Sequence, residues 1–261
     1  MQNAGRVPAF LFMTIPFELH VVVISALVVA AAFVVFGISA FGAALITVPV
    51  LSHFYPLDFV LPVCVLLDVS AALFMGARFS RNADTGELKW MVPLCLIGAV
   101  LGVTLLVNLP RQATLIAFGS FLVFYGVYTL RREEGVHLIS RLWAPVAGFS
   151  GGLMGTLFGV GAPPYAMYLS HRFTDKARLR ATLSSMVLMS TAIRTLVFTF
   201  GGLMLSDRLL MFALLLPFAL GGLYTGNRLQ GRISREQLGR FISGLVLLIG
   251  ASVLIKAVSQ G

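Results

Sequence analysis

Two ionisable residues, Asp68 and Arg194, each lie near the centre of a long apolar stretch, and Arg194 is the only charged residue between Arg180 and Asp207. A charge at the bilayer centre costs about 2.5–3.5 kcal/mol on insertion scales, so such residues usually face the interior of a helix bundle. A guanidinium can hold an oxyanion through two parallel hydrogen bonds. We therefore predict that Arg194 binds an anion. Asp68 is then its partner in a buried ion pair, a proton carrier, or both.

Two further apolar stretches, 19–51 and 142–169, are too long for one straight span and have glycine-rich centres that contain or precede prolines. A helix that breaks inside a membrane leaves unpaired backbone groups, which only protein or a water-filled cavity can cover. Helix N-termini at such breaks direct partial positive charge at a ligand. The alternative is close helix packing through small residues. On the first interpretation the substrate-binding candidates, besides Arg194, are Ser39, Gly42, Ala43, Gly159, Gly161, Ala162, Pro163, Tyr165 and Thr191.

The composition predicts the setting of these residues. The chain is 58% hydrophobic and 11% charged, whereas soluble domains carry about 25% charged residues. Uninterrupted apolar stretches of single-span length favour membrane helices over a barrel, whose strands alternate in hydropathy. We predict an all-α polytopic membrane protein with further spans at 60–77, 90–107, 114–130, 182–205, 209–225 and 241–258.

The basic residues predict the topology, and they give no reason to expect nucleic-acid binding. Fourteen of the 19 Lys and Arg residues fall in four stretches, and the positive-inside rule makes these cytoplasmic, with the N-terminus outside. The stretches are 78–89, 131–141, 171–180 and 227–240. The segment 142–169 must then enter the membrane and return to the same side. We expect solvated acidic residues in the basic loops, namely Asp84, Glu87, Glu133, Glu134 and Asp175.

A weak internal repeat accompanies this topology. The spacing of Pro93, Gly98 and Gly102 recurs 124 residues later in Pro217, Gly222 and Gly226. Each half consists of a glycine-rich broken or re-entrant segment followed by three transmembrane helices. By the charge assignment the halves have opposite orientations, as in many secondary transporters. We predict an N-terminal repeat at 1–130, a cytoplasmic linker at 131–141 and a C-terminal repeat at 142–261.

The two glycine-rich centres also resemble those of a known family. Gly42-Ala43-Ala44 leads to Pro49, and Gly159-Val160-Gly161-Ala162 leads to Pro163-Pro164. Both look like the motifs of the sulfite exporter TauE/SafE family, although alanine replaces some glycines and the second proline comes early. The resemblance covers about 20–258. It implies transport of a small sulfur-containing anion such as sulfite or sulfoacetate.

The sequence therefore predicts a secondary transporter, with export as the expected direction, that binds its anion at the membrane midplane between the repeats. Proton coupling follows if Asp68 titrates. An anion channel or uniporter and a non-transporting membrane subunit are the alternatives. The chain has no HExxH motif, which argues against a zinc enzyme, and it has no Walker-type phosphate loop. We expect no enzymatic activity. We expect an inner-membrane location, no cofactor, no metal and no nucleic acid, and leave a homodimer open.

Overall fold

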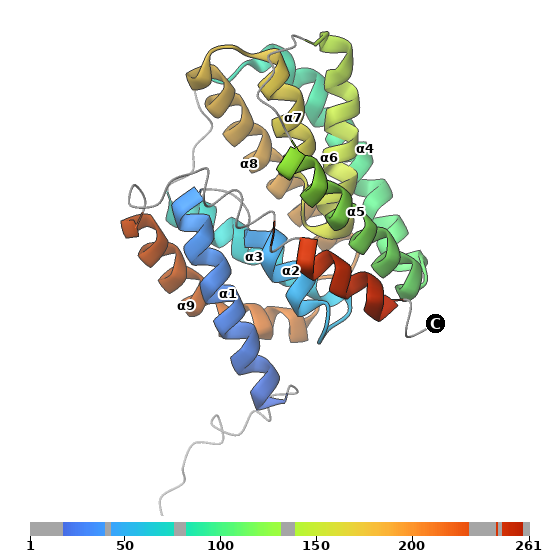
Figure 1. Ribbon diagram of the computed structural model, residues 1–261, viewed down its shortest axis with the longest axis vertical. Coiled ribbons are helices and arrows are strands. Elements are labelled where there is room, and N and C mark those ends of the chain that lie inside the picture. The colour runs from blue at the N-terminus through green and yellow to red at the C-terminus, as the bar shows by residue number, and fades with distance from the viewer. Residues whose placement is uncertain are drawn as a thin grey trace, which may run out of the picture.

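The computed structural model describes residues 18–39, 43–75, 82–131, 139–229, 244 and 247–257, and these contain helices and no strand (Figure 1). The helices are α1 (Leu19–Ser39), α2 (Ala43–Leu51), α3 (Leu57–Phe74), α4 (Thr85–Asn108), α5 (Arg111–Arg131), the short 3-10 helix η2 (Arg141–Trp143), α6 (Ala144–Phe158), α7 (Ala162–Arg172), α8 (Lys176–Phe200) and α9 (Ser206–Leu229). A last apolar helix covers Leu247–Ala257. The prediction of a polytopic helical membrane protein is confirmed.

Five of the described helices are long and apolar enough to cross a membrane, namely α1, α3, α4, α8 and α9. The apolar parts of α5 and of the last helix are shorter in the described residues, at Gln112–Val127 and Leu247–Ala257. Figure 1 shows α1 beside α9 in one part of the molecule, and α4, α6, α7 and α8 together in the other.

Both long glycine-rich stretches are broken helices, as predicted. The first divides into α1 and α2, and the second into α6 and α7. The second break is set by Gly159, whose φ of 74° lies in the left-handed region that glycine adopts without steric cost. Two prolines then begin α7, where a missing N–H costs no helical hydrogen bond.

The broken stretch α6–α7 also returns to the end of the molecule from which it started. The backbone N–H of Ile139, just before α6, donates to the carbonyl of His171 at the end of α7 over 3.1 Å. Residues 139–141 and 171–172 therefore lie together, as the shared basic character of their loops predicted. The break near 40–42, residues 78–81 of the first basic loop and most of the loops 131–141 and 227–240 lie outside the described residues, as do Glu133 and Glu134.

Glycines bring the long helices into backbone contact. The most extensive packing joins α4 to α6 and α1 to α9. A Cβ atom on Gly98 of α4 would overlap the carbonyl of Phe149 in α6, and one on Gly222 of α9 would overlap the carbonyl of Ala30 in α1. Gly98 and Gly222, two of the repeated glycines of the sequence, therefore mark two close helix contacts, which is how small residues act between membrane helices.

The glycine contact predicts the effect of one added methyl group. Gly222→Ala would force α1 away from α9, and overpacking of this kind costs about 1–3 kcal/mol. The neighbouring Gly221 has nothing within 4 Å of its Cβ position, so Gly221→Ala adds only helix propensity. We expect a lower unfolding temperature in detergent for Gly222→Ala and an equal or higher one for Gly221→Ala. Equal temperatures for both variants would contradict this packing.

Candidate functional site

The guanidinium of Arg194 is buried beside the break between α6 and α7. Its Nη1 donates to the carbonyls of Gly155, at 3.1 Å, and Gly159, at 3.4 Å. Its Nη2 donates to the hydroxyl of Thr191, one turn earlier on α8, at 3.3 Å. Strong N–H···O bonds measure about 2.7–3.2 Å. The arginine is therefore held by several partners, most of them at long distances.

Asp68 of α3 is the acidic partner of Arg194, as the sequence predicted. Its Oδ2 lies 3.6 Å from Arg194 Nη2. This is close enough for a strong charge interaction but too long for a good hydrogen bond. The Asp68 side chain is 19% exposed, against 8% for Arg194. The ion pair is thus loose, and its carboxylate retains some access to the surroundings.

The two carbonyls that Arg194 contacts lie at the end of α6. The Gly155 carbonyl also accepts the backbone N–H of Gly159, at 3.0 Å, so Arg194 is its second donor. The last carbonyls of a helix carry partial negative charge, so a cation at this end is stabilised. The opposite effect is weak at the start of α7, because Pro163 and Pro164 have no N–H to offer. Positive charge at this break therefore comes from Arg194 rather than from a helix N-terminus, which revises the expectation drawn from the sequence.

The second break packs against α2, the helix that follows the first break. The Cβ position of Gly159 lies 2.9 Å from a methyl group of Val48 and 3.6 Å from the Cβ of Ala44, both in α2. Ala43, the first residue of α2, is buried. Gly42 and the side chain of Ser39 lie outside the described residues.

Tyr165 is fully buried but its hydroxyl bonds other residues than Arg194. It lies 3.0 Å from the hydroxyl of Ser190 on α8 and 3.2 Å from the sulfur of Cys95 on α4. Ser190 is one turn before Arg194 on α8. This cluster fixes α7 against α8 and α4 and so holds the broken helix beside the arginine.

The other candidates take different positions. Gly161 packs against α6, where a Cβ atom would approach the carbonyl of Gly151 to 2.6 Å. Ala162 is partly exposed, and Pro163 lines a groove between α5, α6 and α7. The structure thus brings Arg194, Asp68, Thr191 and Gly159 together. It also shows that the Gly155 carbonyl accepts from Arg194, a contact that no sequence signal predicts.

Two buried polar atoms near this site have no hydrogen-bond partner among the described residues. They are the Nε of Arg194 and the hydroxyl of Thr47 in α2. Buried polar groups are almost always bonded to protein, water or a ligand. Thr47 directly precedes Val48, which contacts Gly159. The site therefore has hydrogen-bonding capacity that the described protein groups do not use.

The expectation that the acidic residues of the basic loops are solvated is wrong for Glu87 and for Asp84. The Asp84 side chain is only 9% exposed, and the Glu87 carboxylate is completely buried. Its Oε1 accepts from the Nε atoms of Arg141 and Arg172, both at 3.0 Å, and its Oε2 accepts from the Tyr168 hydroxyl at 2.6 Å. Because Glu87 lies on the same face of α4 as Gly98 and Gly102, helical spacing could have shown that it faces α6.

Asp84, just before α4, extends this cluster. Its carboxylate accepts from the backbone of Gly86 and Glu87 and pairs with Arg178 at 2.6 Å. Partial burial opposes its charge, but the backbone N–H groups and Arg178 outweigh this and lower the pKa of Asp84. Together Glu87 and Asp84 join the starts of α4, α6 and α8 to the end of α7.

Comparison with known proteins gives two matches. The family model described as Sulfite exporter TauE/SafE matches residues 24–253. The "Probable inner membrane transporter protein TsaS" of Comamonas testosteroni is 26% identical over 193 residues, which cover 72% of this chain and 80% of that protein. No solved structure matches.

The Glu87 cluster predicts a loss of stability on neutralisation. Glu87→Gln leaves two guanidiniums without their shared carboxylate. Breaking a fully buried ion pair costs about 3–5 kcal/mol, and the cost here is smaller because Arg141 and Arg172 are 46% and 32% exposed and can be solvated. Asp175→Asn is the control, because Asp175 is exposed and Asn caps a helix as well as Asp does. We expect a lower unfolding temperature for Glu87→Gln alone. A Glu87→Gln protein as stable as Asp175→Asn would show that the cluster contributes little.

Proposed function

Because this chain belongs to the sulfite exporter TauE/SafE family, whose model matches nearly its whole length, we propose that it carries a small sulfur-containing anion across the inner membrane. The chain is a multi-pass inner-membrane transporter. Sulfite or an organosulfonate such as sulfoacetate is the proposed substrate class. The observation that supports binding at the midplane is the buried Arg194, whose carboxylate partner stands at 3.6 Å.

The anion is proposed to take the place that Asp68 fills in the unloaded protein. Arg194 uses Nη1 on the carbonyls of Gly155 and Gly159 and one N–H of Nη2 on the Thr191 hydroxyl. Nε and the side of Nη2 that faces Asp68 remain for the substrate. An oxyanion can accept from both through adjacent oxygens, as arginine geometry favours. Thr47, whose hydroxyl has no partner among the described residues, is a further candidate donor, whereas the Thr191 hydroxyl already donates to the Val187 carbonyl.

Several contacts support two inverted repeats at 1–130 and 142–261, joined by the linker 131–141. Helices α1 and α4 belong to the proposed first repeat, and α6 and α9 to the second. α1 packs on α9, and α6 packs on α4 in the corresponding way. Asp58 pairs with Arg208, and the backbone N–H of Asp84 bonds Thr182. Asp58 and Thr182 lie 124 positions apart, and so do Asp84 and Arg208. The proposed repeat therefore relates the contact of Asp58 with Arg208 to the contact of Asp84 with Thr182.

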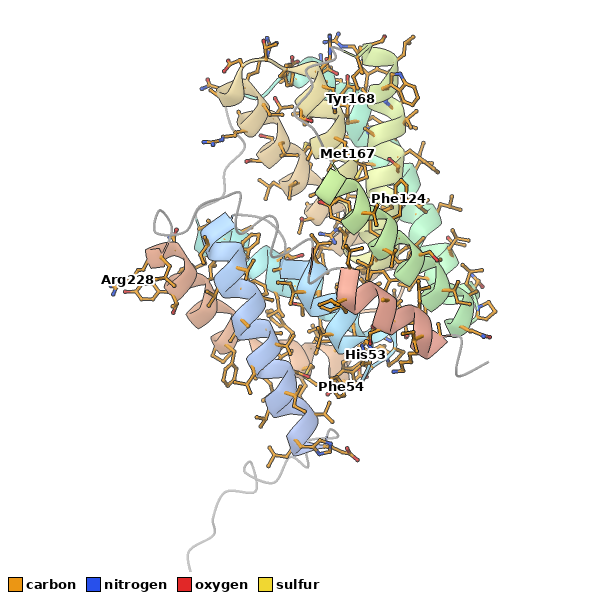
Figure 2. All side chains as sticks on the ribbon, viewed as in Figure 1. His53, Phe54, Phe124, Met167, Tyr168 and Arg228 are labelled. Carbon is orange, nitrogen blue, oxygen red and sulfur yellow. The ribbon has the colours of Figure 1, made fainter. Side chains whose placement is uncertain are left out.

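The ends of α2 and α7 agree with this relation. The Nδ1 of His53 donates to the carbonyl of Pro49, and the Nδ1 of His171 donates to that of Met167, each one turn earlier. Figure 2 shows His53 low in the view and the Met167 region of α7 near the top. The second part of each broken helix thus ends in a similar cap, and we propose that the two ends face opposite sides of the membrane.

This topology is tested by cysteine labelling. We expect that Ser140→Cys and Asp175→Cys, both exposed, react only from the cytoplasmic side, and that Phe54→Cys reacts only from outside. Native Cys64 and Cys95 are buried and serve as the unlabelled background. Labelling of Ser140→Cys and Asp175→Cys from opposite sides would remove the returning hairpin and the inverted repeat together.

The anion site is tested by variants of Arg194. Arg194→Gln removes at least one charge-assisted hydrogen bond to substrate, worth about 1.5–3 kcal/mol, and should weaken binding at least tenfold. Arg194→Lys keeps the charge without the fork and should retain weak binding. Binding is measured by thermal shift with sulfite, sulfoacetate, sulfate, thiosulfate and taurine, and transport by counterflow in proteoliposomes. Wild-type binding and transport by Arg194→Gln would mean that the arginine is structural.

Asp68→Asn separates the roles of the carboxylate. If Asp68 carries protons, the variant keeps counterflow exchange and loses uphill transport. If Asp68 only competes with the substrate for Arg194, the variant binds the anion more tightly and retains uphill transport. A wild-type response in both measurements would exclude both roles.

A further inference from the structure

An apolar groove opens between α5, α6 and α7, and none of the residues that Arg194 contacts lines it. Its volume is about 410 Å³. Aromatic and methionine side chains form half of its wall, and Figure 2 shows three of the lining residues, Phe124 on α5 with Met167 and Tyr168 on α7. A groove of this size matches small-molecule sites, which are largely apolar and of about 300–1,000 Å³.

Two arginines lie close to one end of the groove, although neither lines it. Ile139, Trp143 and His171 line this end. Ile139 and Trp143 are each two residues from Arg141 in the chain, and His171 is next to Arg172. Those two guanidiniums share the single carboxylate of Glu87, so one positive charge is left over. Their side chains are 46% and 32% exposed, which leaves that charge accessible at the surface.

The other end reaches the interior of the membrane region. Met154, in the last part of α6, and Pro163, in the first turn of α7, line it, so the groove runs from the basic end to the helix break. It therefore combines an apolar channel at membrane depth with a positive charge and an exposed tryptophan at its mouth. Basic pockets between membrane helices at the cytoplasmic face bind the headgroups of anionic lipids.

We propose that this groove binds one acyl chain of an anionic phospholipid, with the headgroup phosphate against Arg141 and Arg172. The apolar walls take the chain and the unbalanced arginine takes the phosphate. A chain seated against Pro163 and Pro164 braces the start of α7 beside the helix break. The proposal concerns a site separate from the anion site and does not depend on what the protein transports.

The two tryptophans of the chain provide the test. Trp143 lines the groove, whereas Trp90 is exposed on α4 near the same end and is not among the lining residues. Trp90→Phe and Trp143→Phe therefore each leave one reporter at a similar depth. Each protein is placed in phosphatidylcholine vesicles with a small fraction of phosphatidylglycerol brominated on its acyl chains, which quenches nearby indoles. Brominated phosphatidylcholine at the same fraction is the comparison.

We expect brominated phosphatidylglycerol to quench Trp143 more than Trp90, and brominated phosphatidylcholine to quench both alike. In the Trp90→Phe background, Ser150→Phe fills the groove and should abolish the excess quenching. Thr104→Phe is its control, because Thr104 also bonds its own helix but faces outward on α4. Arg141→Gln, which leaves Glu87 paired with Arg172, should lower the preference for phosphatidylglycerol by roughly fivefold, the usual effect of one arginine near an anionic headgroup.

Two outcomes would overturn the proposal. Equal quenching of Trp143 and Trp90 by phosphatidylglycerol would mean that the groove has no lipid preference. Weaker quenching of Trp143 than of Trp90 by both lipids would mean that protein, such as a second copy of this chain, covers the groove. Circular dichroism of Ser150→Phe and Thr104→Phe shows whether each has kept its helices, and a helical Ser150→Phe protein that retains the excess quenching also contradicts the site.

Discussion

The structure depends on one constraint: a helix that ends inside a membrane leaves carbonyl groups that only protein or a water-filled cavity can cover. Arg194 donates to the carbonyls of Gly155 and Gly159 at the end of α6, and its own charge is in turn balanced by Asp68. Each of these groups would be costly alone. Together they form a set in which the broken helix, the arginine and the carboxylate require one another, while Nε remains without a partner among the described residues. A substrate anion fits such a set because it can take the place of the Asp68 carboxylate beside Arg194, so that the positive charge of the arginine stays paired.

Close packing through glycine supports this set from both sides. Lipid chains are as apolar as leucine, so helices in a membrane associate through contact rather than through removal of apolar surface from water. Gly98 and Gly222 allow α4 to touch α6 and α1 to touch α9, and Gly159 allows the second break to touch Val48 of α2. The small residues therefore serve the packing and the site at once, and the two interpretations of the glycine-rich centres are compatible.

The charged residues fall into two classes with different roles. Glu87 and Asp84 tie helix ends together through short, well-formed bonds, and the surplus charge of Arg141 and Arg172 faces outward beside an apolar groove. Asp68 and Arg194 form a longer and looser pair. Short, fully satisfied pairs suit a fixed scaffold, whereas a loose pair suits a site where a partner must exchange.

The resemblance of its glycine-rich motifs indicates the family of this chain. The sequence also predicts the helical membrane class, the breaks in both long segments and the pairing of Asp68 with Arg194. These three features follow from hydropathy, from glycine and proline, and from the cost of a charge in lipid, all of which act locally along the chain. Three further findings needed the three-dimensional arrangement: Arg194 contacts backbone carbonyls at the end of α6, Tyr165 bonds Ser190 and Cys95, and Glu87 is buried between two arginines. Those facts depend on which helix faces approach each other, and residue types alone do not specify the orientation of a helix about its axis.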